Sequence, residues 1–233
     1  NNDPEKTEPD KEHFFKMFDE LYSRGTRWVC ILGGEPLLRK DIGDILEYAK
    51  NLGLYIEMAT NGWFIKRHIS ALKKVDHLFI SLDGDKETCE VTRGPGTYDR
   101  VIEGLTILKE NNIKFRIHAV LTRPSQDSLT HILELGKKYG VPVNFSEPGV
   151  VNKTREKYPD LFLSAQEVKG FYDKVQGLMR QGHNISSPHV ALKYLEEWPL
   201  SDRIMVMESD PQEIKSKVYK CYLKHLNCFI DVD

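Results

Sequence analysis

The sequence predicts an α/β fold built on a parallel sheet, and three observations point to it. Short apolar runs typical of strands alternate five times with segments in which apolar residues recur at helical spacing. One helix separates each strand from the next, which favours right-handed βαβ crossovers. Gly25, Gly53 and Gly140 each lie between a helix and the following strand, where a left-handed residue often ends a helix. Periodicity alone leaves a barrel-like sheet and an open, doubly wound sheet as alternatives.

The elements follow from their local patterns. Phe14, Phe18 and Tyr22 share one face of the first helix, and the continuous apolar run over 28–32 predicts a strand buried on both faces. Beyond residue 146 the alternation stops, and a capping box from Ser164 to Glu167 predicts a helix that ends near residue 179. The expected helices are 11–24, 41–52, 65–75, 98–111, 125–139 and a shorter one at 188–197, and the expected strands are 28–32, 54–60, 77–82, 114–121 and 141–146.

Composition excludes several classes of protein. The 233 residues include 33 Lys+Arg and 35 Asp+Glu, and 40% of them are hydrophobic, which argues against disorder. No apolar run approaches the roughly 20 residues of a membrane span, and the formal net charge of −2 argues against nucleic acid as the main partner. Four cysteines are too few for a disulfide scaffold, so we expect a cytoplasmic protein. Because the chain begins at Asn1 and ends directly after an apolar run, we expect it to be part of a longer protein with another strand upstream.

The clearest chemical signal follows the first expected strand, at Gly33-Gly34-Glu35-Pro36. Two glycines allow a sharp turn and close approach of a ligand to the backbone. Glu35 adds a carboxylate at the carboxyl edge of the sheet, where ligands bind in α/β proteins. Backbone carbonyls and a carboxylate together suit an ammonium group, which only donates hydrogen bonds. The alternative is an ordinary turn with a solvent-facing glutamate.

Polar residues also follow the next two strands. Asn61 ends one of them within Thr-Asn-Gly, and the strand after it ends in Ser-Leu-Asp-Gly, in which alternation places Ser81 and Asp83 on one side. These groups suit a sugar diol or another polar ligand, although both segments are also common turn sequences. Arg93 precedes Gly-Pro-Gly in the expected loop, where it would be aimed at a carboxylate or lie on the surface.

In combination, these three strand ends resemble the radical S-adenosylmethionine (radical SAM) superfamily. The resemblance covers about residues 11–146 and implies a partial (β/α)6 barrel of the TIM type, here without its first strand. It assigns the amino group of SAM to Gly33, Gly34 and Glu35. It places Asn61, Ser81, Asp83 and Arg93 among the other contacts to SAM, with Ser81 and Asp83 near the ribose or carboxylate.

The resemblance also implies a reaction. A [4Fe-4S] cluster would reduce SAM to a 5′-deoxyadenosyl radical that abstracts hydrogen from a substrate, with electrons from a flavodoxin or ferredoxin. We expect a peptide or protein substrate; a small-molecule substrate, a non-catalytic SAM-fold binding module and a cluster-free α/β enzyme are the alternatives. The Cys-x3-Cys-x2-Cys loop that holds this cluster in the family is absent from the sequence. We expect it upstream of residue 1.

The remaining signals concern cysteine and histidine. Cys221 and Cys228, followed by Phe-Ile-Asp-Val-Asp, resemble the opening of a SPASM or twitch domain and would bind an auxiliary [4Fe-4S] cluster; a zinc site and two unrelated thiols are the alternatives. The expected organisation is a partial barrel at 1–150, an extension at 151–218 and the start of the auxiliary domain at 219–233. Cys30 is expected to be a core thiol, and His118 to face the barrel interior or to pack against it.

Overall fold

The computed structural model describes residues 9–148, 157–187 and 211–213, and it contains one five-stranded parallel sheet. The strands are β1 (Trp28–Ile31), β2 (Tyr55–Thr60), β3 (His77–Ser81), β4 (Phe115–Val120) and β5 (Val143–Ser146). Their order in the sheet equals their order in the chain. All five carboxyl ends therefore lie at the same edge, as βαβ connections require.

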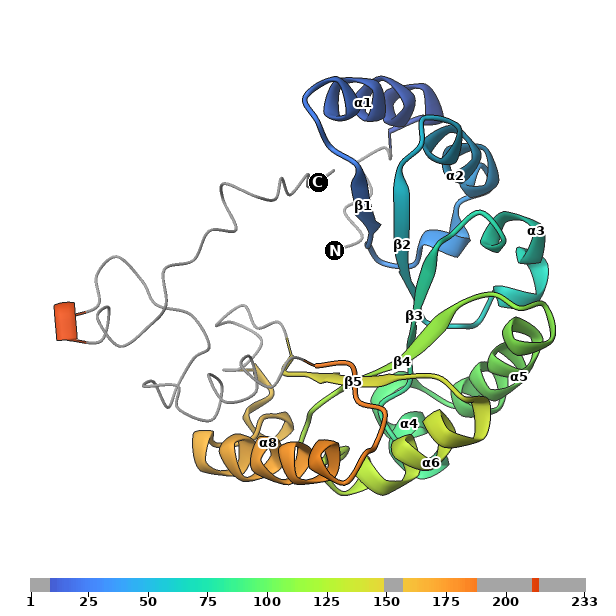
Figure 1. Cartoon of the computed structure of the whole chain (residues 1–233). Helices are drawn as coiled ribbons and strands as arrows, with labels where there is room; N and C mark the ends of the chain where they lie inside the picture. Colours follow the sequence, from blue (N-terminus) through green and yellow to red (C-terminus); the bar gives the residue numbers. More distant parts are fainter. Residues whose placement is uncertain (1–8, 149–156, 188–210, 214–233) are drawn as a thin grey trace.

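Helices cover one side of this sheet, which curves without closing (Figure 1). This arrangement confirms the predicted α/β fold and, within it, an open, partial TIM-like barrel. The helices are α1 (Lys11–Ser23), α2 (Ile42–Asn51), α3 (Ile69–Leu72), α4 (Lys86–Arg93), α5 (Thr97–Glu110), α6 (Leu129–Tyr139) and α8 (Ala165–Arg180), and the 3-10 turns are η1 (Pro36–Leu38), η2 (Ile65–Arg67), η3 (Gln126–Ser128) and η4 (Pro159–Leu161).

The two faces of the sheet differ in chemistry because side chains alternate along each strand. On the convex face, under the helices, Ile56, Met58, Leu78 and Ile80 are fully buried. Burial of each such side chain contributes about 1.5–3 kcal/mol to stability. The opposite side, here called the concave face, carries partly buried and mostly polar side chains. It comprises Glu57, Ala59, His77, Phe79, Ser81, Arg116, His118, Asn144 and Ser146.

Strand β1 differs from its prediction. It is the edge strand of the described sheet, and its side chains are exposed or half-buried, so the expected burial on both faces is wrong. Cys30 is accordingly half-buried on the side of Glu57 and Arg116, away from the main core. Partial burial and the Glu57 carboxylate still raise the pKa of its thiol to about 11.

Two helical segments also differ from expectation. The single helix expected over 65–75 is a 3-10 turn, η2, followed by the one-turn helix α3. The expected loop before α5 contains α4, which begins where the Asp85 side chain accepts a hydrogen bond from the Thr88 backbone N–H. Helix α4 has few apolar residues, so hydrophobic spacing gives little sign of it. Arg93 is its last residue and therefore lies on a helix.

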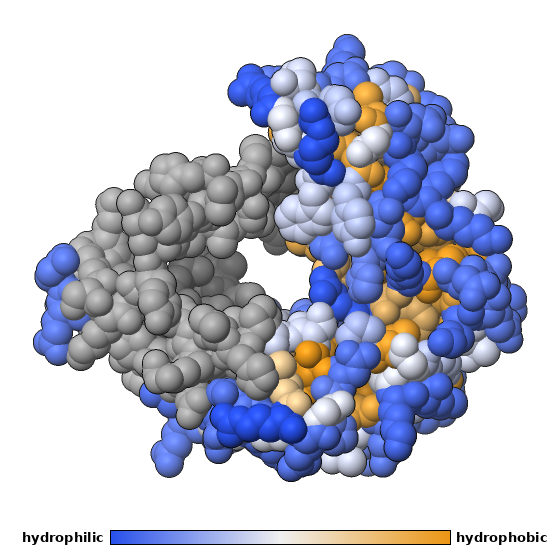
Figure 2. Space-filling view, in the orientation of Figure 1, coloured by the Kyte–Doolittle hydropathy of each residue, from blue (hydrophilic) through white to orange (hydrophobic). Residues whose placement is uncertain are grey.

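Further along the chain, the predicted capping box is confirmed. Ser164 and Glu167 exchange hydrogen bonds at the start of α8, which ends at Arg180. The helix expected at 188–197 lies outside the described residues. None of the described helices is long and apolar enough to cross a bilayer. Hydrophilic side chains cover much of the outer surface in Figure 2, with apolar groups visible between them.

Candidate functional site

The turn after β1 exposes its backbone at the carboxyl edge of the sheet. Gly33 has a φ of +145°, a conformation that favours glycine. A Cβ atom placed on Gly33 or Gly34 would meet no atom within 4 Å. The backbone of this turn is therefore accessible from the side where a side chain would stand.

The Glu35 carboxylate joins this turn to the end of β2. Its Oε1 accepts hydrogen bonds from Thr60 Oγ1 at 2.7 Å and from the Leu37 N–H at 3.1 Å, and its Oε2 accepts from the Asn61 N–H at 2.6 Å. The alternative of a solvent-facing glutamate is therefore wrong. A carboxylate offers about four acceptor positions, so three bonds leave room for one more donor. The site thus presents a fixed, negatively charged acceptor beside an open glycine backbone.

Asn61 lies next to this carboxylate. Its backbone N–H binds Glu35, and its Oδ1 accepts a hydrogen bond from the Trp63 N–H at 2.9 Å. This is an Asx turn, which is the usual local role of asparagine after a strand. Contact between Asn61 and a ligand remains a prediction.

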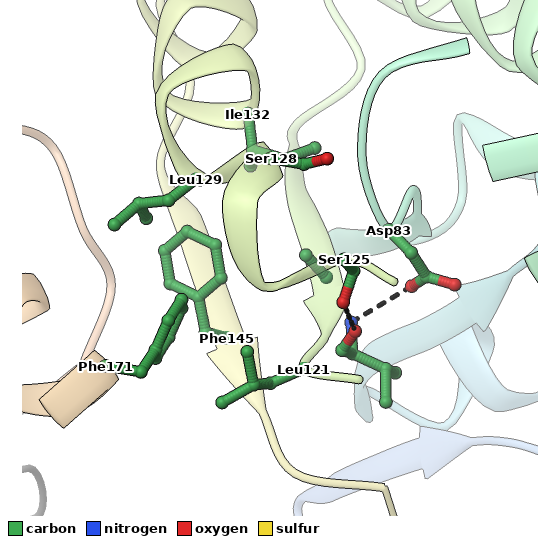
Figure 3. Close-up of a pocket in the computed structure, with 10 residues that line it drawn as sticks. Asp83, Leu121, Ser125, Ser128, Leu129, Ile132, Phe145 and Phe171 are labelled. Atoms are coloured by element: carbon green, nitrogen blue, oxygen red, sulfur yellow. Dashed lines mark hydrogen bonds between the residues drawn. The ribbon is translucent and has the colours of Figure 1, made fainter. Parts of the chain in front are cut away.

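Asp83 and Arg93 form a two-pronged ion pair. Arg93 Nε donates to Oδ2 at 2.7 Å and Arg93 Nη2 donates to Oδ1 at 2.9 Å, while the Val120 N–H also donates to Oδ1 at 3.0 Å. Asp83 is 6% exposed, and Figure 3 shows its carboxylate facing this backbone N–H. The carboxylate is therefore engaged inside the protein, and it fixes the direction of the guanidinium at the end of α4. The Nη1 end of Arg93 is not used in this pair.

Ser81 and Asp83 have different neighbours. Ser81 is the last residue of β3 and stands beside His118 of β4 on the concave face. Asp83 lies two residues past the end of β3 and lines a small pocket with Ser128 and Ile132 (Figure 3), and its charge also acts on the pKa of His118. The expectation that Ser81 and Asp83 share one side stays a prediction.

The concave face contains a polar network that the motif analysis found only in part. His118 Nδ1 lies 2.7 Å from Asn144 Nδ2, and His118 Nε2 lies 3.0 Å from Ser146 Oγ. Burial lowers the pKa of His118, so its imidazole is neutral near pH 7. His118 thus faces the interior, which was one of its two predicted positions. The sequence feature that could have identified its partners, Asn144 and Ser146, is the alternation of polar and apolar residues in the expected strands 114–121 and 141–146.

The described residues offer no place for a metal cluster. They contain no group of three or more His, Cys, Asp or Glu side chains arranged to hold a metal ion. The two cysteines among them, Cys30 and Cys89, lie on β1 and α4 as free thiols. Cys221 and Cys228 fall outside the described residues. The residues described here therefore do not suit an iron–sulfur cluster.

Comparison with known proteins identifies the family. A family model for the radical SAM superfamily matches residues 1–145. Fe-coproporphyrin III synthase of Methanosarcina barkeri is 31% identical over 200 residues, which cover 78% of this chain and 50% of the relative. Mycofactocin maturase MftC of Mycolicibacterium smegmatis is 29% identical over 164 residues, which cover 67% and 41%. The chain spans half or less of the length of these curated relatives.

Solved structures share the fold. Crystal structures of Streptococcus suis SuiB bound to S-adenosylmethionine and to its precursor peptide SuiA match with TM-scores of 0.67 and 0.64 at 19% and 18% identity. The matches cover 83% and 79% of this chain and 47% and 44% of the SuiB chains. The family model covers well over half of the sequence, and the fold and the strand-end motifs agree with it. The chain therefore belongs to the radical SAM superfamily.

Proposed function

We propose that this chain forms the SAM-binding part of a radical SAM enzyme that modifies a peptide or protein substrate. The observation that carries the proposal is the Glu35 carboxylate, which is held between the ends of β1 and β2 and keeps an acceptor position beside an accessible glycine turn. This arrangement complements the α-ammonium group of SAM.

The other predicted contacts follow from the same edge of the sheet. Gly33 and Gly34 would offer backbone carbonyls to the ammonium group. Arg93, directed by Asp83, would place its free Nη1 end toward the SAM carboxylate, and Ser81 would bind the ribose. Asp83 itself would act through Arg93, because its own oxygens are already engaged.

Bound SAM and a reducing [4Fe-4S] cluster would supply the radical chemistry of the whole protein. The Cys-x3-Cys-x2-Cys ligands of that cluster are not among the residues of this chain. For the C-terminal part, we propose that residues 151–218 form an extension and that Cys221 and Cys228 begin an auxiliary-cluster domain at 219–233. A flavodoxin or ferredoxin would provide the electrons.

A peptide substrate is supported by the fold shared with SuiB, whose crystal structure holds the precursor peptide SuiA. A small-molecule substrate is the second candidate, since the Fe-coproporphyrin III synthase matches over a larger share of this chain than the maturase does. A SAM-binding module without catalysis would bind SAM and leave it intact.

The test of SAM binding is a calorimetric titration of the chain and of its Glu35→Gln variant. Glutamine keeps the size of the side chain and removes its charge. Loss of a charge-assisted hydrogen bond of about 1.5–3 kcal/mol predicts a SAM affinity about 10- to 100-fold weaker. Glu110→Gln, at an exposed helix end, is the matched control and should bind SAM as the unchanged chain does. Equal affinity in the Glu35→Gln variant would show that this carboxylate does not hold the ammonium group.

Catalysis is tested on the whole protein, produced without oxygen and supplied with iron, sulfide and a strong reductant. Formation of 5′-deoxyadenosine from SAM is expected. Stimulation of this product by candidate precursor peptides, and not by porphyrins or GTP, would support the peptide substrate. Tight SAM binding without cleavage would favour the non-catalytic module.

A further inference from the structure

Three buried polar atoms on the concave face have no hydrogen-bond partner. They are His77 Nε2, Arg116 Nε and Asn144 Oδ1, and they are all such side-chain atoms found among the described residues. They belong to the neighbouring strands β3, β4 and β5. Leaving one such atom unpaired costs about 1–3 kcal/mol, so native proteins contain few. Their concentration on one face makes that face a candidate for a ligand that supplies the missing partners.

Arg116 stands at the centre of this group. Its guanidinium carbon lies 3.7 Å from the centre of the Phe79 ring, the neighbouring residue across the strand pair. Nη1 donates to Ser186 Oγ at 3.2 Å and Nη2 donates to Glu57 Oε1 at 3.4 Å. The last distance is long for a charge-assisted bond, which is usually about 2.7–2.9 Å. The guanidinium is therefore held in place by its surroundings, while its buried Nε–H has no hydrogen-bond partner.

Asn144 supplies the complementary acceptor. Its Nδ2 faces His118 Nδ1 at 2.7 Å, so the amide nitrogen donates and the amide oxygen is left unpaired. His118 then carries its proton on Nε2, toward Ser146 Oγ. The face thus holds an unused donor on β4 and an unused acceptor on β5.

The charges on this face are balanced. Glu57 and Arg116 are 15% and 20% exposed and neutralise each other. Burial lowers the pKa of both His77 and His118, with the charge of Arg116 acting in the same direction. Both imidazoles are therefore neutral near pH 7. Burial raises the pKa of Cys30 to about 11, so its thiol is neutral as well.

Other charged groups also act on these two imidazoles. Lys114, exposed just before β4, further lowers the pKa of His77. Arg93 lowers the pKa of His118 and its partner Asp83 raises it, and these two charges are paired beyond the end of β3.

We propose that the concave face binds uncharged amide groups of the substrate backbone, and that Glu57 determines this specificity by neutralising Arg116. A peptide group has a carbonyl to accept from Arg116 Nε and an N–H to donate to Asn144 Oδ1. A substrate carboxylate would instead meet the Glu57 carboxylate at Arg116. The inference rests on the proposed peptide substrate and deepens it.

The test uses two peptides that differ by one charge, acetyl-(Gly-Ser)3-amide and acetyl-(Gly-Ser)3 with a free carboxylate. Nitrogen-15 NMR follows the Arg116 Nε–H and the Asn144 side-chain amide during titration. In the unchanged chain, the amide peptide should shift both signals saturably, and the acid should bind no more tightly. In a Glu57→Gln variant the acid should bind at least about tenfold more tightly than the amide, since a charge-assisted hydrogen bond contributes about 1.5–3 kcal/mol. Glu47→Gln, which removes an exposed partner of Lys74, should behave as the unchanged chain does.

Three results would overturn the proposal: preference of the unchanged chain for the acid, no shift at Arg116 or Asn144 with either peptide, or no gain of acid binding in Glu57→Gln. SAM binding is measured separately through Glu35. Failure of the peptide titration with normal SAM binding would therefore refute this inference alone, whereas loss of SAM binding would refute the proposed function.

Discussion

Asp83→Asn tests the buried pair that directs Arg93. The carboxylate accepts two hydrogen bonds from Arg93, one from the Val120 N–H and a longer one from Thr92 Oγ1 at 3.4 Å. Asparagine has only one acceptor oxygen, so in either orientation its NH2 group faces at least one of these donors. The variant loses a charge-assisted bond of about 1.5–3 kcal/mol and leaves a half-buried guanidinium without a counter-charge.

The expected loss of unfolding free energy is about 2–4 kcal/mol. Breaking a fully buried pair costs about 3–5 kcal/mol, and the lower value applies because the Arg93 side chain is 22% exposed. Urea unfolding followed by circular dichroism measures this loss. The control is Asp99→Asn, which breaks the exposed pair with Lys86 and should leave stability nearly unchanged.

A double-mutant cycle with Arg93→Gln isolates the pair. The two single substitutions should cost more in sum than the double variant does. Additive losses, or an Asp83→Asn protein that unfolds at the same urea concentration as the unchanged chain, would refute the structural reasoning.

The remaining predictions concern acid stability, packing and the glycine turn. Burial holds the pKa of His118 below its ordinary 6.5, so the unfolded chain binds more protons than the folded chain and the free energy of unfolding falls as the pH drops below about 6.5. In urea unfolding between pH 5 and 8, His118→Gln should make the free energy of unfolding less dependent on pH. Gly136→Ala would bring a Cβ to 2.6 Å from Val143 Cγ1 and should lower the free energy of unfolding by about 1–3 kcal/mol. Its control, Gly170→Ala, has no neighbour within 4 Å and should raise the free energy of unfolding by up to about 1 kcal/mol. Equal effects of the two substitutions would contradict the close packing of α6 on β5. Glu35→Ala should lower the thermal unfolding temperature more than Glu35→Gln does, because alanine removes the acceptor of three donors, and equal temperatures would contradict the bridging role.

Local patterns in the sequence were sufficient to predict the alternation of strands and helices and the glycine turn with Glu35. The reason is that hydrophobic periodicity, helix caps and turn chemistry depend on residues within a few positions of one another. The same patterns failed for α4, which is short and polar, and for the burial of β1, whose apolar run forms an edge strand.

Tertiary structure decided which polar residues meet. Glu35 contacts Thr60 and Asn61, and Asp83 contacts Val120, only because parallel strands far apart in the chain end at one edge of the sheet. The pairing of Arg116 with Glu57 likewise depends on strand register, since a shift of one residue would move either side chain to the opposite face. The sequence alone determined the family and most of the elements, whereas the partners of each charged side chain, and the balance of charge on the concave face, followed from the three-dimensional register of the strands.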